Sequence, residues 1–89
     1  MMERIATDHW RVNGETKIEE FRKEYPRLKE YPEVDTMGGL LVSRLQIVPQ
    51  VGQSVMLDGL RLTAEVVDER RVLVLKVSNV GNRAKAKVP

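Results

Sequence analysis

Residues 35–39 form the part of the sequence best suited to hold an anion. They read Asp-Thr-Met-Gly-Gly and stand at the predicted start of a helix, where backbone N–H groups lack partners within the helix. Such groups can hold a phosphate. The alternative, which we favour, is that Asp35 or Thr36 caps the helix and that Gly38 and Gly39 allow a strand to pack closely. The segment lacks the lysine and the spacing of a phosphate-binding loop.

The remaining reactive side chains do not form a recognisable catalytic set. His9 is the only histidine and cysteine is absent, so neither a transition-metal site nor a nucleophilic triad can be assembled convincingly. Glu30, Glu33 and Asp35 lie close together in the sequence, and three carboxylates could help to hold a hard cation. Their spacing lacks the pattern of a calcium loop, so we favour a solvated loop.

Four arginines could contact the phosphates of a nucleotide: Arg44, Arg61, Arg70 and Arg71. The favoured alternative is that they form surface ion pairs with nearby acids, each contributing little to stability. We therefore predict no catalytic and no metal-binding residues. The candidate ligand-binding residues are Thr36, Gly38, Gly39 and Arg61.

The net charge of +2 comes from the end of the chain. Residues 1–82 carry 12 basic against 13 acidic residues, and Arg83, Lys85 and Lys87 follow. The body is thus nearly neutral, and we predict no nucleic-acid partner. A length of 89 residues with 42% hydrophobic residues predicts one domain with one core. The absence of cysteine fits a reducing compartment.

Hydrophobic periodicity predicts one strand, two helices and three further strands, after an arm at residues 1–8. The first strand ends at a turn signal, Asn13-Gly14. Thr16 and Glu19 form a predicted capping box for the first helix, which should end near Tyr25 because Pro26 follows. The second helix should bury the apolar residues that recur at helical spacing, namely Met37, Leu40, Leu41 and Leu45. Asp58-Gly59 predicts a tight hairpin between later strands.

The last predicted strand, residues 71–77, is apolar on both faces. Strict alternation places Val72 and Val74 on one face, and Leu73, Leu75 and Val77 on the other. One face must meet the helices, so the other needs cover from a second copy, a neighbouring domain or a membrane-proximal surface. The alternative is a sheet curled enough to bury both faces, and we favour a partner. We predict Leu73 and Val74 as the partner-contact residues.

In this order the motifs resemble the transporter-associated domain of the CorC/HlyC family. The residues that carry the resemblance are Val12-Asn13-Gly14, Ile18-Glu19-Glu20-Phe21, Asp35-Thr36-Met37-Gly38-Gly39-Leu40, Val48-Pro49-Gln50-Val51-Gly52, Asp58-Gly59-Leu60-Arg61-Leu62 and Arg70-Arg71-Val72. They span roughly residues 9–78. Gln53 departs from the family pattern, which tends to have an acid there, and Leu73 and Val74 stand where the family is often polar.

The predicted order of the elements, β-α-α-β-β-β, favours an α+β domain in which two helices cover one face of a small antiparallel sheet. The resemblance implies that this is the FAD-binding/transporter-associated domain fold. The expected boundaries are a flexible arm at 1–8, the domain at 9–80 and a disordered basic tail at 81–89.

The resemblance also implies a non-catalytic regulatory or interaction domain. It would be the C-terminal module of a haemolysin-like membrane protein that exports magnesium or cobalt, and it would lie on the cytoplasmic side. Its implied partners are a paired nucleotide-binding regulatory module and the membrane domain of the parent protein, with a homodimer as a further option. The main hypothesis requires no cofactor; the alternative is a small-ligand domain for an adenine nucleotide or FAD, by fold analogy.

Overall fold

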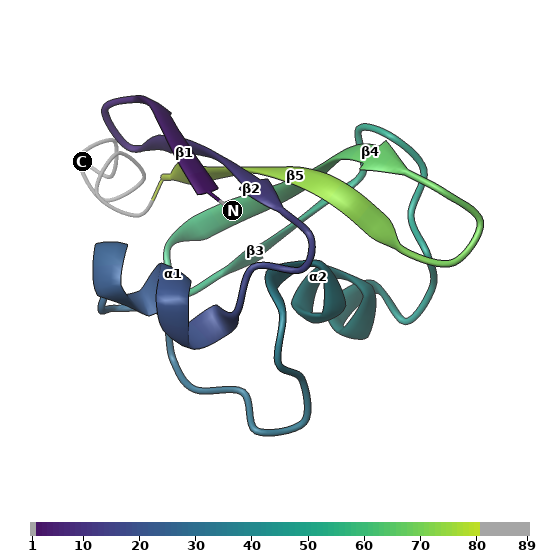
Figure 1. The fold of residues 1–89 in the computed structure, drawn as a ribbon, viewed down its shortest axis with the longest axis horizontal. Coiled ribbons are helices and arrows are strands. Elements are labelled where there is room, and N and C mark those ends of the chain that lie inside the picture. The colour runs from purple at the N-terminus through teal and green to yellow at the C-terminus, as the bar shows by residue number, and fades with distance from the viewer. Residues whose placement is uncertain (1, 81–89) are drawn as a thin grey trace, which may run out of the picture.

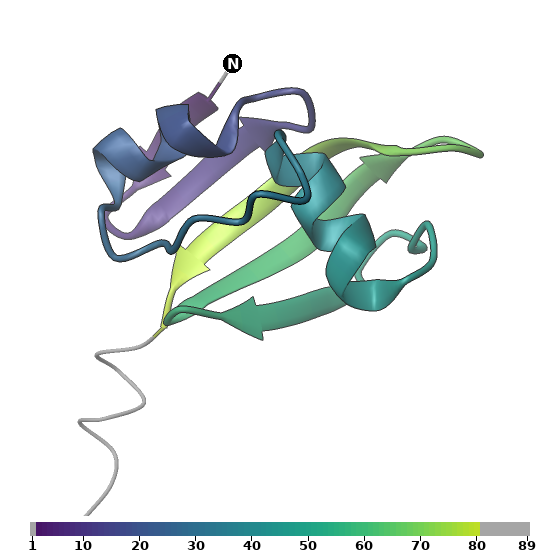
Figure 2. The same ribbon diagram turned by 90° about the horizontal axis from the view of Figure 1, so that it is seen from below.

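The computed structural model describes residues 2–80, which form an antiparallel sheet with two helices on one face (Figure 1). The elements in chain order are β1 (Met2–Ala6), β2 (His9–Asn13), α1 (Ile18–Glu24), α2 (Met37–Leu45), β3 (Ser54–Leu57), β4 (Leu60–Val67) and β5 (Val72–Asn79). The strand order in the sheet is β1-β2-β5-β4-β3. Figure 2 shows α1 crossing the β1–β2 side of the sheet and α2 crossing the β4–β5 side. The predicted α+β class, with two helices over one face of a small antiparallel sheet, is confirmed.

The predicted arm at residues 1–8 is wrong, because Met2–Ala6 forms the edge strand β1. This strand pairs with β2 in an antiparallel hairpin, with Met2 opposite Val12 and Arg4 opposite Trp10. Apart from its first residue β1 is exposed, so its sequence has no alternating apolar pattern to mark it. Residues 2–6 form a strand because their backbone pairs with that of β2, which the hydrophobic pattern does not predict. The predicted disordered tail at 81–89 lies outside the described residues.

The core lies between the inner face of the sheet and the helices. Trp10 of β2 packs edge-on against Phe21 of α1, with ring centroids 5.2 Å apart, and against Tyr25, at 6.4 Å. Leu40 and Leu41 of α2 are fully buried over the other half of the sheet. The predicted apolar stripe of α2 therefore faces the core, with Leu45 partly buried at its end.

The predicted capping box of α1 is wrong. The helix begins at Ile18, and its N-cap is Lys17, which makes no side-chain capping bond. Thr16 is instead buried, and its carbonyl accepts the Met37 N–H at 2.9 Å, while the Ile18 N–H donates to the Asp35 carbonyl at 2.8 Å. The segments before the two helices therefore bind each other through backbone hydrogen bonds. The predicted end of the helix near Tyr25 is confirmed.

The predicted faces of the last strand are also wrong. Val72, Leu75 and Val77 are all buried, Val74 is half-buried, and Leu73 is 36% exposed. The β4–β5 register shifts twice, so that Leu73 has no residue opposite it in the ladder. Such an irregularity interrupts the two-residue period, which allows Val72 and Leu75 to lie on the same face.

Candidate functional site

The start of α2 is capped and closely packed, as the sequence predicts. Thr36 is the N-cap, and its Oγ1 accepts the Gly39 N–H at 3.0 Å. A Cβ atom on Gly38 would lie 2.8 Å from the Gly14 carbonyl oxygen and 3.0 Å from that of Val72. The glycine at position 38 therefore lets α2 contact the backbone of the β2–α1 turn and of β5.

The same contacts use the backbone donors that a phosphate would need. The Met37 N–H donates to the Thr16 carbonyl at 2.9 Å, the Gly38 N–H to the Gly14 carbonyl at 2.9 Å, and the Gly39 N–H to Thr36. The first three N–H groups of α2 thus have protein acceptors. An anion at this helix start would have to displace one of these bonds.

Arg61 does not join Thr36, Gly38 and Gly39. It lies in β4 between the fully buried residues Leu60 and Leu62, so alternation places its side chain on the sheet face opposite the helices. The structure therefore brings three of the predicted ligand-binding residues together and places the fourth on the other face.

A hollow of about 710 Å³ adjoins the start of α2, and we call it the α2 groove. It lies between the β2–α1 turn, α2 and the β4–β5 turn. Its lining residues are Gly14, Glu15, Lys17, Val34, Thr36, Gly38, Gly39, Val42, Ser43, Arg70, Arg71 and Val72. Sequence reasoning associated Arg70 and Arg71 with phosphates but did not place them beside the glycine pair.

The charged lining of the α2 groove is mainly basic. Arg71 pairs with Glu15 at 3.1 Å and with Asp68 at 3.8 Å. Within residues 2–80, neither the Lys17 ammonium nor the Arg70 guanidinium has an ion-pair partner. The Asp68 carboxylate accepts the backbone N–H groups of Arg70 and Arg71, each at 2.8 Å, and these bonds lower the pKa of Asp68.

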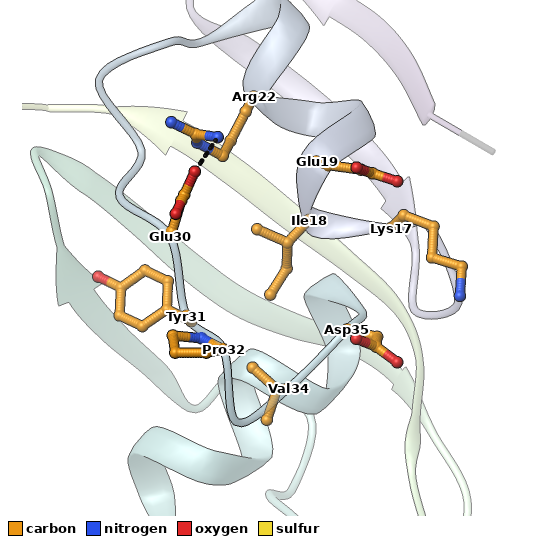
Figure 3. Close-up of a pocket in the computed structure, with 9 residues that line it drawn as sticks. All are labelled: Lys17, Ile18, Glu19, Arg22, Glu30, Tyr31, Pro32, Val34 and Asp35. Carbon is orange, nitrogen blue, oxygen red and sulfur yellow. Dashed lines mark hydrogen bonds and ion pairs between the residues drawn. The ribbon is translucent and has the colours of Figure 1, made fainter.

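A second hollow, of about 370 Å³, lies between α1 and the α1–α2 connector (Figure 3). Glu30 points toward Arg22, with which it pairs at 3.4 Å, whereas Asp35 lies at the other end of the hollow. In the part of the chain that the structure describes, no three His, Cys, Asp or Glu side chains are arranged to hold a metal ion. Glu30, Glu33 and Asp35 therefore do not form the cation set that was considered from sequence.

The Asp58 carboxylate joins the α1–α2 connector to the β3–β4 hairpin. Its Oδ2 accepts the Lys29 N–H at 2.9 Å and the Tyr31 hydroxyl at 2.7 Å, and its side chain is only 8% exposed. The Tyr25 hydroxyl donates to the Asp58 carbonyl at 2.8 Å. Sequence reasoning identified Asp58 as a turn residue and missed these contacts, because no local pattern links positions 29 and 58.

Ionisation of the Tyr31 hydroxyl should lower the stability of the domain at alkaline pH. Burial, and next the hydrogen bond to Asp58, raise the pKa of Tyr31 from 10.0 to about 12. The folded state therefore binds this proton more tightly than the unfolded state, so the contribution is complete below pH ~10 and is lost as pH rises toward ~12. We expect the urea midpoint, followed by circular dichroism, to fall less over this range in Tyr31→Phe than in the wild type. Equal falls would contradict this role.

Val74 lies on the outer face of the sheet, opposite Asn13 of β2, and its neighbour Leu73 is 36% exposed. Val74 lines a hollow of about 440 Å³ with Met2, Glu3, Arg11 and Asn13. This face is otherwise more polar than the sequence predicts. The Arg11 guanidinium bonds Glu65 at 3.0 Å and lowers the pKa of that carboxyl, and Lys76 lies 3.5 Å from Glu65. The apolar residues of this face include Val74 and the exposed Met56 of β3, which lies opposite Arg61.

Neither helix in the described part of the chain is long and apolar enough to cross a bilayer.

Comparison with known proteins gives a consistent result. The model of the CorC_HlyC family, the transporter associated domain, matches residues 3–81. The magnesium and cobalt efflux protein CorC of Buchnera aphidicola is 28% identical over 80 residues, which are 90% of this chain and 28% of that protein. The chain thus spans little more than a quarter of the length of this curated relative.

Two solved structures extend the likeness to three dimensions. One is the associated region of a putative Mg²⁺ and Co²⁺ transporter (CorC) from Neisseria meningitidis, with a TM-score of 0.83 and 29% identity, covering 89% of this chain and 98% of that one. The other is a hemolysin domain from Enterococcus faecalis, with a TM-score of 0.79 and 31% identity, covering 88% of this chain and 95% of that one.

Proposed function

Because this chain belongs to the CorC_HlyC family of transporter-associated domains, we propose that it is a non-catalytic regulatory and interaction module of a membrane protein that exports magnesium or cobalt. The family match over residues 3–81 carries this proposal. It is supported by curated relatives that are magnesium and cobalt efflux proteins and are more than three times as long as the matched segment. The module would lie at the C-terminal, cytoplasmic end of the parent protein.

The proposed mechanism is contact. The domain docks against the paired nucleotide-binding regulatory module of the parent protein, against its membrane domain or against a second copy. A ligand that binds one conformation of the partner then shifts the equilibrium between the docked and undocked states of this domain. The transport rate depends on the fraction of domains that is docked. Two candidate surfaces are the α2 groove on the helix side and the outer sheet face around Val74, next to the exposed Leu73.

The nucleotide or FAD alternative has less support from the geometry. It relies on Thr36, Gly38 and Gly39, where the first N–H groups of α2 already donate to protein oxygens. It also relies on Arg61, which lies on the opposite face of the sheet. These observations favour contact with a protein.

Cation export by the parent protein tests the proposed function. Cells would express the parent protein intact or without this domain, at matched amounts in the membrane, and the export of Mg²⁺ and Co²⁺ would be followed over a range of cytosolic Mg²⁺. We expect the deletion to change either the export rate or its dependence on Mg²⁺. Identical export curves would refute a regulatory role.

Leu73→Asp and Val74→Asp should weaken association while the monomer stays folded. Leu73 is 36% exposed, and Val74 is half-buried on the outer face, so a carboxylate at either position can reach water. Circular dichroism should show a folded domain, and sedimentation should show weaker self-association or weaker binding to the parent's regulatory module. Exposed Met56→Asp, at the distant edge strand β3, is the matched control. Unfolding of both variants would contradict the prediction.

A further inference from the structure

We infer that the α2 groove binds an acidic segment of a partner protein in which aliphatic residues alternate with Asp or Glu. This inference rests on the proposed function, because it names the chemistry of one partner of a contact module. It is carried by the charge of the lining, by its apolar surface and by the lack of free backbone donors.

The charge of the α2 groove suits an acidic partner. The groove is lined by Lys17, Arg70 and Arg71, whereas its one acidic lining residue, Glu15, already pairs with Arg71. Lys17 and Arg70 have no ion-pair partner among residues 2–80. Two unpaired cations at one hollow favour an anionic partner.

The lining of the α2 groove also has an apolar part. Val34 of the connector and Val42 of α2 are half-buried residues that line it, whereas Val72 of β5 is buried in the core. Gly39, which is half-buried, adds no side chain over the first turn of α2, so a partner can approach that turn at this position. A surface of this kind favours an occupant with aliphatic side chains between its charges.

The donors of the α2 groove suit a peptide better than a phosphate. A bound phosphate at a helix start is held by free backbone N–H groups. Here the N–H groups of Met37, Gly38 and Gly39 donate to Thr16, Gly14 and Thr36. The remaining donors are long cationic side chains set apart on different segments. That arrangement suits carboxylates spaced along a chain better than one compact anion.

The β4–β5 turn is also held in a defined shape. The Asp68 carboxylate accepts the N–H groups of Arg70 and Arg71 at 2.8 Å, and Arg71 is further tied to Glu15 across the groove at 3.1 Å. The backbone that carries Arg70 is therefore ordered before a partner arrives. Such preorganisation lowers the entropic cost of binding.

Selection from a random displayed peptide library, with the 89-residue chain as bait, tests this inference. We expect the enriched peptides to contain at least two Asp or Glu residues next to Leu, Ile or Val. Labelled copies would be titrated by fluorescence polarisation into the wild type and into Lys17→Ala/Arg70→Ala. The double variant should bind about tenfold more weakly, as expected for the loss of two exposed ion pairs.

The matched control is Lys23→Ala/Arg4→Ala, which removes the same charge from exposed positions outside the α2 groove. It should bind the peptides within about twofold of the wild type. Enrichment of peptides without acidic residues, a failure to enrich any, or equal affinity in Lys17→Ala/Arg70→Ala would each overturn the inference. Displacement of the peptide by millimolar inorganic phosphate or ADP, at constant ionic strength, would identify a small-anion site and also overturn it.

Failure of this inference and failure of the proposed function give different results. If export by the parent protein changes on deletion of the domain but the groove variant binds peptide normally, only the groove assignment is wrong. If the groove variant loses peptide binding but the deletion leaves export unchanged, the contact is real and the regulatory role is wrong.

Discussion

Gly14→Ala should be among the most destabilising single substitutions in this domain. A Cβ atom at position 14 would lie 1.9 Å from the Val72 carbonyl oxygen and 2.9 Å from its carbon. Both are backbone atoms of a buried strand, so neither can rotate away. The Gly14 N–H also donates to the Leu73 carbonyl at 2.8 Å, and any shift that relieves the clash stretches that bond.

We expect a loss of about 3 kcal/mol, at the upper end of the range for overpacking. This loss is a large share of the roughly 5–15 kcal/mol by which small domains are stable. In a domain of this size it should lower the melting temperature by more than ~10 °C. Gly39→Ala is the matched control, because its nearest foreign atom is the Thr36 hydroxyl oxygen, 2.9 Å away on a side chain that can rotate. A partly lost cap and a gain in helix propensity should nearly cancel there, each worth ~1 kcal/mol. Calorimetry showing the same melting temperature for both variants would contradict the prediction.

Three segments that carry sequence motifs meet at Gly14. Gly14, Gly38 and Val72 come from the β2–α1 turn, α2 and β5, and each brings backbone atoms to within contact of the others. The same three residues line the α2 groove. Close backbone packing and the proposed docking surface are therefore two consequences of one arrangement. A substitution that separates the three segments should change both stability and binding.

The sequence was sufficient where the signal is local. Thr36 as a cap, the apolar stripe of α2 and the Asp58-Gly59 hairpin each depend on residues within a few positions of one another, and the structure has all three. The close approach at Gly38 was also predictable, since two glycines at a helix start weaken the helix unless the backbone is contacted there.

The sequence was insufficient where the signal is distant or irregular. β1 is held by pairing with β2 and buries little apolar surface, so periodicity does not mark it. The outward turn of Leu73 depends on two register shifts against β4, which alternation cannot predict. The separation of Arg61 from Gly38 follows from which face of the sheet the helices cover, a property of the assembled fold.

Asp58→Ala should be the second large effect, because Asp58 links segments about 30 residues apart. The substitution removes the acceptor of the Lys29 N–H and of the Tyr31 hydroxyl, both bound to Oδ2 of a carboxylate that is 8% exposed. It also places alanine at a φ of 53°, a region that Asp and Asn tolerate better. Hydrogen bonds to a charged group contribute about 1.5–3 kcal/mol each. Allowing for relaxation of the exposed connector, we expect a total loss of about 3 kcal/mol.

The pattern across variants identifies the cause of this loss. Asp58→Asn keeps the turn conformation and one acceptor oxygen, so it should lose about half as much as Asp58→Ala, and Tyr31→Phe should lose ~1 kcal/mol. The double variant Asp58→Ala/Tyr31→Phe should be no less stable than Asp58→Ala alone, since the shared hydrogen bond is already absent.

Glu33→Ala, at an exposed position of the same connector, is the charge control and should change stability by less than ~0.5 kcal/mol. Urea unfolding gives these values, and hydrogen exchange at the Lys29 amide should accelerate in Asp58→Ala. If Asp58→Ala and Glu33→Ala were equally stable, the connector would be held by its apolar contacts, and the carboxylate would serve only the hairpin turn.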